Sequence, residues 1–429
     1  MNKNSYRIVF NESRGCRMAV AETAASQGKS SHGERTSHAP QKRRALSPLA
    51  LACKRVSQAV LFSAAALWLS PMQAQTVATR IVADPGAARS QQATVLSTSN
   101  GVAQVNIQTP SAAGVSRNTY RQFDVGSTGA ILNNSRTHAQ TQLGGWVQGN
   151  PWLATGSARV ILNEVNSSNP SHLQGHVEVA GQRAEVVIAN PAGIAINGGG
   201  FINASGVTLT SGTPVIHNGN LESYRVQGGS ISVDGLGLDT RTADYTAILS
   251  RAAQVNAGIW ANRLQVVTGA NQIDANTLGT DAPVQTSVIT ATGAASTYAL
   301  DVGQLGGMYA GKIMLIGTEA GLGLRNAGLV QASSGPLLLT QEGWLSNSGT
   351  MQASGGDVQI QAKGSIEQRG TLYSDKNVQI TSQVNQRHSG TTAALGNVRI
   401  EATGTNADDT AAQISASNTS VWAAGLQTD

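Results

Sequence analysis

Charged and aromatic residues are scarce in this chain of 429 residues. Asp, Glu, Lys and Arg make up 12% of it and Phe, Trp and Tyr only 4%, whereas glycine occurs 48 times. This is poor in charge and in aromatic rings for a globular enzyme. It favours short strands joined by tight turns. A disordered chain is excluded, because 40% of the residues are apolar and many of them alternate with polar ones.

Cysteine is absent beyond the first part of the chain, since Cys16 and Cys53 are the only two. Residues 75–429 therefore cannot be cross-linked by a disulfide in an oxidising compartment.

Excess positive charge is also absent from residues 75–429. Residues 1–74 hold 11 Lys/Arg and 3 Asp/Glu, which leaves 18 Lys/Arg and 21 Asp/Glu for residues 75–429. That balance gives no support to nucleic-acid binding, which needs a basic face.

Residues 26–74 read as a signal peptide for the Sec translocon. Val56 to Leu69 form an apolar run, which follows the basic residues Lys42, Arg43, Arg44, Lys54 and Arg55. The run is shorter than the roughly 20 residues of a spanning helix, so a membrane anchor is disfavoured. Met72-Gln73-Ala74 ends on a small residue, which predicts cleavage between Ala74 and Gln75.

A further basic block precedes this signal. Residues 1–25 contain Met1-Asn2-Lys3, Tyr6-Arg7, Val9-Phe10-Asn11 and Ala19-Val20-Ala21-Glu22. The block closely resembles the extended signal peptide region of large exported proteins of Gram-negative bacteria. The resemblance implies slowed targeting to the inner membrane.

The sequence repeats itself after residue 300. Gly328, Gly349, Gly370 and Gly390 are 21, 21 and 20 residues apart, and apolar triplets begin at Leu337, Val358, Val378 and Val398. A constant period of this kind indicates a solenoid. The segments alternate as strands do, with Val358 and Ile360 on one face and Gln359 on the other. We therefore predict an all-β protein, a right-handed parallel β-helix of about 21 residues per coil with three short strands in each.

Residues 187–212, VIANPAGIAINGGGFINASGVTLTSG, fit one such coil. Asn190, Asn197 and Asn203 each follow a short apolar piece, and Gly193, Gly200 and Gly206 each precede the next one. Asn and Gly are the residues that turns with positive φ prefer. We predict that this stretch forms the three faces of an early coil.

Residues 76–325 are similar to the two-partner-secretion domain of filamentous haemagglutinin-type exoproteins, in the branch that mediates contact-dependent growth inhibition. Asn163-Glu164-Val165 matches the family's NEV element, Gly181-Gln182-Arg183-Ala184 its AGQRA turn, and Asn190-Pro191-Ala192-Gly193-Ile194 its Asn-Pro-Asn-Gly-Ile motif. Two departures stand out. Ala192 replaces the usual Asn, and the upstream Asn-Pro-Asn-Leu motif is represented by Asn133-Asn134-Ser135-Arg136, without proline.

The resemblance implies partners and a division of the chain. The unfolded exoprotein would be recognised in the periplasm by an Omp85-type outer-membrane transporter (the TpsB partner), thread outward and fold outside the cell. The implied fold adds an N-terminal cap and extra-helical hairpins to the β-helix. Residues 75–315 would be the secretion domain and residues 316–429 haemagglutinin-type repeats. The expected location is secreted or on the outer cell surface, and a host or sister-cell receptor is a further expected partner.

The NPAGI segment admits two interpretations. Either the transporter reads its side chains, or it is only a turn that folding requires, with Pro191 fixing φ and Gly193 allowing a tight corner. Under both, its loss impairs secretion. The residues expected to serve recognition are Asn190, Pro191, Gly193, Ile194, Asn133 and Asn134, with the turn elements Asn163, Glu164, Gln182 and Arg183.

An enzyme is the main alternative, because β-helices also host polysaccharide lyases and hydrolases. Such enzymes need converging carboxylates or a basic residue. Asp234, Asp239 and Asp244 are five residues apart and alternate between faces of a strand, so we expect no convergence. His172 and His176 lack the further ligands of a metal site. Trp146, Trp152 and Trp260 could stack on sugars, but we expect them to cap or fill the ends of the rod.

The sequence therefore predicts the N-terminal part of a secreted exoprotein that carries neither a catalytic site, nor a metal, nor a cofactor. Adhesion or delivery of a C-terminal toxin would be the biological purpose. A stand-alone adhesin and an extracellular polysaccharide-active enzyme remain the competing interpretations.

Overall fold

The computed structural model describes residues 6–11, 16–21, 78–294, 296–404, 414–416, 420–422 and 425–428. The predicted cleavage site at Ala74 and Gln75, like the rest of the predicted Sec signal, lies outside these residues. The chain divides into two units, Met1–Gln73 and Ala74–Asp429. In the first unit, β1 (Tyr6–Asn11) pairs antiparallel with β2 (Cys16–Ala21).

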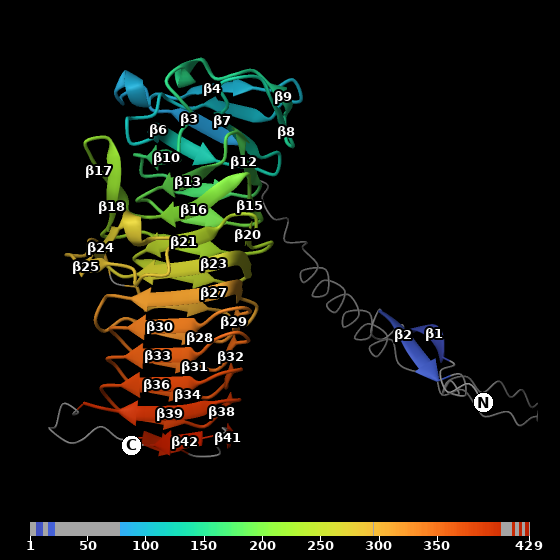
Figure 1. The fold of residues 1–429 in the computed structure, drawn as a ribbon, viewed down its shortest axis with the longest axis vertical. Coiled ribbons are helices and arrows are strands. Elements are labelled where there is room, and N and C mark those ends of the chain that lie inside the picture. The colour runs from blue at the N-terminus through green and yellow to red at the C-terminus, as the bar shows by residue number, and fades with distance from the viewer. Residues whose placement is uncertain are drawn as a thin grey trace, which may run out of the picture. The chain divides into compact units, whose positions relative to one another are not determined.

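The second unit is a stack of coils, each with one strand on each of three faces (Figure 1). One coil runs from β14 (Ile194–Ile196) through β15 (Gly199–Ile202) to β16 (Ala204–Thr210). Each of these strands pairs in parallel with the strand on the same face of the coil before it. We name the faces after these strands: face C holds β14, face B holds β15 and face A holds β16.

The three faces continue along the stack. Face A comprises β10 (Val160–Val165), β13 (Ala184–Ala189), β16, β21 (Tyr245–Ser250), the second halves of β23 (Gly258–Thr268) and β27 (Gly307–Gly317), β30 (Leu337–Gln341), β33 (Val358–Ala362), β36 (Val378–Ser382), β39 (Asn397–Ala402) and β42 (Gly425–Thr428). Face B comprises β7 (Ala130–Asn134), β12 (His176–Gly181), β15, β20 (Leu238–Thr240), the first halves of β23 and β27, β29 (Leu329–Ala332), β32 (Thr350–Ala353), β35 (Thr371–Ser374), β38 (Thr391–Ala394) and β41 (Ser420–Trp422). Face C comprises β11 (Ser171–Leu173), β14, β19 (Ser230–Val233), β22 (Ala252–Val255), β26 (Tyr298–Val302), β28 (Gly323–Asn326), β31 (Leu345–Asn347), β34 (Ile366–Gln368), β37 (Gln386–His388) and β40 (Ile414–Ala416).

The predicted period is confirmed by the strand register. Leu337, Val358, Val378 and Val398 are direct Cα partners in successive coils, and at most 1% of each is exposed. Their side chains belong to one apolar core that runs from Ile81 to Ile400. A single coil could not bury these side chains alone, so stacking supplies the burial. The predicted fold class, a parallel β-helix, is confirmed.

An antiparallel cap covers the N-terminal end of the stack. β3 (Arg80–Ala83) pairs antiparallel with β6 (Val115–Asp124), and β4 (Thr94–Ser97) with β5 (Ala103–Asn106). This pairing occupies strand edges that would otherwise stay open to other chains. The cap region also contains the short hairpin β8–β9 and two 3-10 turns: β8 (Ala139–Thr141), β9 (Gly145–Val147), η1 (Arg89–Gln91) and η2 (Pro151–Leu153).

A second sheet lies against the outside of face A. It consists of β17 (Thr213–His217), β18 (Asn220–Val226), β24 (Asn271–Asp274) and β25 (Thr286–Val288), with the 3-10 turn η3 (Ala275–Thr277) before β25. All its pairings are antiparallel. Tyr224 and Ile273 of this sheet pack on outward side chains of face A such as Val187. None of the helices in the described residues is long and apolar enough to cross a membrane.

The opening coil agrees with its prediction except at two glycines. β13, β14, β15 and β16 contain the short apolar pieces of the predicted coil, residues 187–212. Gly193 has φ 107° and Asn203 has φ 59°, so both take the left-handed conformation. Gly200, however, lies inside β15 and Gly206 inside β16, instead of before these strands. Position 206 is a glycine because a Cβ there would sit 2.3 Å from the ring of Tyr245.

Candidate functional site

Asn190 forms the corner between face A and face C. It directly follows β13, and its backbone carbonyl accepts a hydrogen bond from the Gly193 amide at 2.9 Å, which closes a four-residue turn with Pro191 in second position. The Asn190 side-chain oxygen accepts a hydrogen bond from the Ala192 amide at 2.9 Å. Its carboxamide is fully buried. A Cβ at Gly193 would lie 2.7 Å from the Ser230 carbonyl oxygen of the next coil, so only glycine fits this corner.

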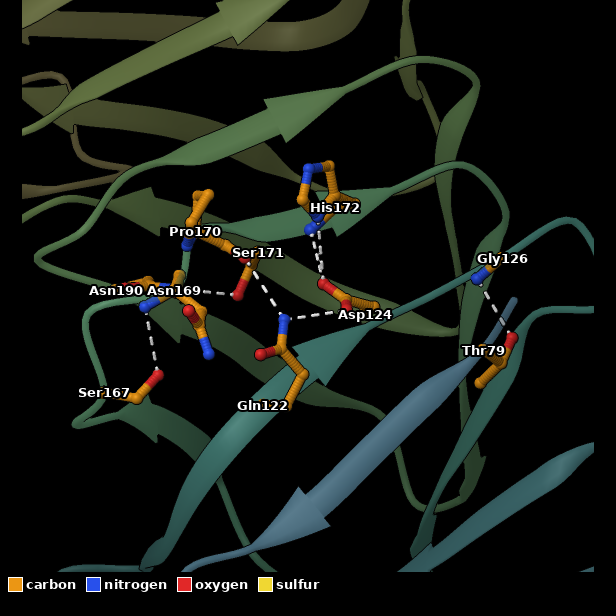
Figure 2. A network of polar contacts seen from close by, with 10 residues as sticks. All are labelled: Thr79, Gln122, Asp124, Gly126, Ser167, Asn169, Pro170, Ser171, His172 and Asn190. Carbon is orange, nitrogen blue, oxygen red and sulfur yellow. Dashed lines mark hydrogen bonds and ion pairs between the residues drawn. The ribbon is translucent and has the colours of Figure 1, made fainter. Parts of the chain in front are cut away.

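The same carboxamide binds the preceding coil. The Asn190 Nδ2 atom donates to the Asn169 carbonyl oxygen at 2.9 Å and to the Ser171 hydroxyl at 3.0 Å. Figure 2 shows that this contact belongs to a polar network at one corner of successive coils. One coil earlier, the Gln122 Nε2 atom donates to the Pro170 carbonyl oxygen at 3.3 Å and to the Asp124 carboxylate at 2.7 Å. The corner therefore ties three coils together.

Asp124 adds a further contact to this corner. Its Oδ1 atom accepts from the His172 amide at 2.9 Å and lies 3.2 Å from the His172 ring nitrogen Nδ1. The Asp124 carboxylate is 9% exposed. Ser171, Asp124 and Gln122 were not singled out in the sequence. The alternation of Ser171 and Leu173 shows only that Ser171 faces inward, and nothing in the pattern marks it as the partner of Asn190.

Asn133 and Asn134 lie at a different corner, where face B turns toward face A. Both side chains are fully buried. The Asn133 Nδ2 atom donates to Asn106 and to the Gln148 carbonyl oxygen, each at 2.8 Å. The Asn134 side chain donates to the Gln182 carbonyl oxygen at 2.8 Å and accepts from the Ala158 amide at 2.7 Å. The two asparagines therefore hold the cap and the next coil in register, without the proline of the related motif.

The AGQRA turn is part of this second corner. Gly181 is the Cα partner of Asn134, and both Gln182 and Arg183 are exposed. The Arg183 guanidinium donates to the Ala204 carbonyl oxygen at 3.0 Å and forms a bidentate pair with Asp244, at 2.9 and 3.1 Å. Arg183 thus links two later coils along the outside of the stack.

Asn163 and Glu164 lie within β10 on face A. The Asn163 carboxamide points inward, where its Oδ1 atom accepts from the Tyr120 hydroxyl at 3.1 Å and its Nδ2 atom donates to the Val187 carbonyl oxygen at 3.1 Å. Glu164 pairs with Arg117 of the preceding coil at 2.8 Å. These residues join coils and do not meet either corner. Among the predicted recognition residues, Pro191 and the AGQRA residues Gln182 and Arg183 are exposed, whereas the others are buried.

The three aspartates considered for an enzymatic role each pair with a different residue. Asp239 pairs with Arg241, Asp244 with Arg183, and the Asp234 carboxylate accepts from Asn256 at 2.8 Å. The described residues contain no group of three or more His, Cys, Asp or Glu side chains that could hold a metal ion.

The predicted place of the tryptophans is wrong for Trp260. It lies on face B in the middle of the stack, with its ring parallel to that of Tyr309 in the next coil at a centroid distance of 6.0 Å. Its outward position in β23 follows from alternation with the buried Ile259 and Ala261. Trp152 lies in η2 of the cap region, and Trp146, in β9, is 71% exposed.

Comparison with known families decides the assignment of this architecture. The family model described as the TPS secretion domain matches residues 79–368, and the model for the extended signal peptide of the type V secretion system matches residues 1–51. The chain belongs to the two-partner secretion (TPS) family. The interpretation of the chain as the N-terminal secretion region of an exoprotein on the cell surface is thereby confirmed, and membership implies a partner transporter.

Individual relatives of this TPS protein agree. The toxin CdiA of Yersinia pestis is 51% identical over 352 residues, and the tRNA nuclease CdiA-2 of Burkholderia pseudomallei (strain 1026b) is 47% identical over 350 residues. Each alignment covers 80% of this chain, and the chain spans about a tenth of either relative (10%). The crystal structure of the filamentous hemagglutinin secretion domain superposes with a TM-score of 0.55 at 25% identity, covering 81% of this chain and 99% of that one.

Proposed function

We propose that residues 75–315 form the part that an Omp85-type outer-membrane transporter recognises, after export through the Sec translocon. The β-helix then folds outside the cell and starts the filament, which residues 316–429 extend. The filament serves contact-dependent delivery of a toxin or adhesion, toward a receptor on a host or sister cell. We propose no catalytic activity for the chain. Apolar burial at about 25 cal/mol per Å² for each added coil would favour outward movement.

We further propose that Asn190 of the NPAGI corner acts by folding and not by presenting its side chain to the transporter. The single observation that supports this is the burial of the Asn190 carboxamide between two coils, where it hydrogen-bonds to Asn169 and Ser171. A transporter that meets the folded corner cannot touch this side chain. A transporter that meets the unfolded chain can, so the two mechanisms differ in their dependence on Ser171.

Secretion of four single variants, coexpressed with the transporter, tests this proposal. Asn190→Ala and Pro191→Ala remove motif residues, whereas Ser171→Ala removes only the hydroxyl that Asn190 binds, 19 residues upstream. The matched control is Ser346→Ala, an outward serine on face C in a later coil. The amounts of protein in the medium and in the periplasm are measured for each variant.

If the folded corner is needed, Asn190→Ala and Ser171→Ala both lower secretion strongly, and Ser346→Ala does not. If the transporter reads the motif side chains in the unfolded chain, Ser171→Ala is secreted normally while Asn190→Ala is not. Normal secretion of both Asn190→Ala and Pro191→Ala would remove the motif from the mechanism altogether.

A further inference from the structure

A continuous column of outward side chains runs along face B. Successive Cα partners in five coils are Trp260, Tyr309, Gln331, Gln352 and Tyr373. They alternate with inward, fully buried residues such as Met308, Val330 and Met351. We call these five residues the face B strip. In Figure 1, face B runs down one side of the stack, where β20, β29, β32 and β38 are labelled.

The strip carries rings and amides and no charge. The neighbouring outward column, two residues earlier in each strand, is also uncharged, and its members are Gly258, Gly307, Leu329, Thr350 and Thr371. Within the described residues, the carboxamides of Gln331 and Gln352 make no hydrogen bond to protein. Their donors and acceptors are therefore available to a ligand.

Two glycines allow the rings of Trp260 and Tyr309 to lie flat against face B. A Cβ at Gly258 would be 2.4 Å from the Trp260 ring, and a Cβ at Gly307 would be 2.7 Å from the Tyr309 ring. Each ring therefore covers the glycine two residues before it. The two ring planes differ by 12°. Together they form a platform that continues into the amides of the next two coils.

We propose that the face B strip binds an extended neutral glycan, lying along the axis of the stack. Parallel aromatic rings stack on the apolar faces of pyranose rings, and amides hydrogen-bond to their hydroxyl groups. Coils repeat every 4.8 Å or so, which is close to the length of one sugar unit in an extended glycan. One sugar per coil thus meets one side chain of the strip. In the coil before Trp260, Asp239 continues the column, with its carboxylate paired to Arg241.

A protein partner fits this surface less well. The flanking column offers a single apolar side chain, Leu329, beside glycines and threonines, and the strip has no charge that could be matched by a partner. This inference is independent of the proposed transporter, because binding is measured on the purified, folded chain.

Titration of the full secreted chain with cellohexaose and with chitohexaose, both neutral and extended, tests the proposal. Binding is followed by calorimetry and by tryptophan fluorescence. We expect saturable binding of at least one hexasaccharide, weakened roughly tenfold or more by Trp260→Ala and by Tyr309→Ala. Gln352→Ala should weaken it less. The matched control Trp146→Ala removes an exposed tryptophan outside the strip and should leave the affinity unchanged.

Trp260→Phe keeps an aromatic ring and is the control for loss of the fold in Trp260→Ala. It should retain most of the binding that Trp260→Ala loses, at an unchanged urea midpoint. The absence of binding of both hexasaccharides to the unmodified chain would overturn the proposal. So would an equal loss from Trp146→Ala, or a dimer that Trp260→Ala dissociates in sedimentation, which would make a second copy the occupant.

Discussion

The carboxamide nitrogen of Asn190 lies 3.0 Å from the hydroxyl of Ser171, one coil earlier on the stack. Neither group is exposed to solvent. Backbone ladders hold adjacent strands together along each face, but at the corners the backbone turns away and its polar groups need other partners. Asn190 provides such a partner, because its side chain hydrogen-bonds both within its own turn and to the preceding coil.

Asn190→Ala should therefore destabilise the fold. It deletes two donated bonds and one accepted bond and leaves the Asn169 carbonyl and the Ala192 amide without this partner. We expect a loss of about 1–3 kcal/mol in the free energy of unfolding, measured by urea denaturation of the purified chain. The control is Asn397→Ala, an exposed asparagine on β39. An unchanged midpoint for Asn190→Ala would show that the corner is not a stabilising element.

Much of this fold can be predicted from the sequence, because repetition makes the pattern visible. Val358, Val378 and Val398 occupy equivalent positions, so their spacing gives the coil length directly. Asn190 and Gly193 could be placed at a corner for the same reason, since their residue types suit a turn. The opening coil was predicted nearly strand for strand.

The rest could not be predicted because it interrupts the repeat or depends on packing. The segments 213–226 and 271–288 leave the coil, and their alternation resembles that of any other strands. The partnership of Asn134 with Gln182 spans 48 residues and crosses a corner that no local pattern marks. The place of Trp260 could not be predicted because it depends on room for its ring, left by Gly258 two residues earlier and by Gly237 of the preceding coil.

Gly370→Ala tests the close approach of coils at the glycine corner. A Cβ at Gly370 would lie 1.9 Å from the Gly349 carbonyl oxygen. This oxygen belongs to the backbone and cannot rotate away as a side chain could. We expect a loss of about 2–4 kcal/mol in urea denaturation. Gly335→Ala is the matched control, since its Cβ would meet its nearest neighbours at an ordinary 3.4 Å. Equal midpoints for the two variants would mean that the coils can separate locally at little cost.

Glu185→Gln tests the burial of a carboxyl group on face A. Burial raises the pKa of the Glu185 carboxyl, against opposing hydrogen bonds from Tyr245 and Thr208. A raised pKa in the folded state means that this carboxyl contributes stability at pH values below its unfolded pKa and that the contribution is lost as pH rises. At neutral pH the neutral amide should therefore stabilise the fold, with a difference that shrinks toward pH 4.5, the ordinary value. Urea midpoints across this range measure it. A variant less stable than the parent at neutral pH would contradict the prediction.

His388→Gln tests the interior column of polar side chains between faces C and B. Asn326, Asn347 and Gln368 form a ladder across successive coils, with bonds of 2.8 Å, and His388 occupies the next position, 1% exposed. Burial lowers the pKa of the His388 ring from its ordinary 6.5.

Because that pKa is lowered, the unfolded chain takes up the proton at higher pH than the folded one. The contribution of His388 to stability is thus complete above pH 6.5 and is lost as the pH falls toward the folded-state pKa. Glutamine keeps a hydrogen-bonding amide, as at Gln368, without a titrating group. Between about pH 8 and pH 5, the urea midpoint of His388→Gln should fall less steeply than that of the unmodified chain. Parallel profiles would show that protonation of His388 is not coupled to the stability of these coils.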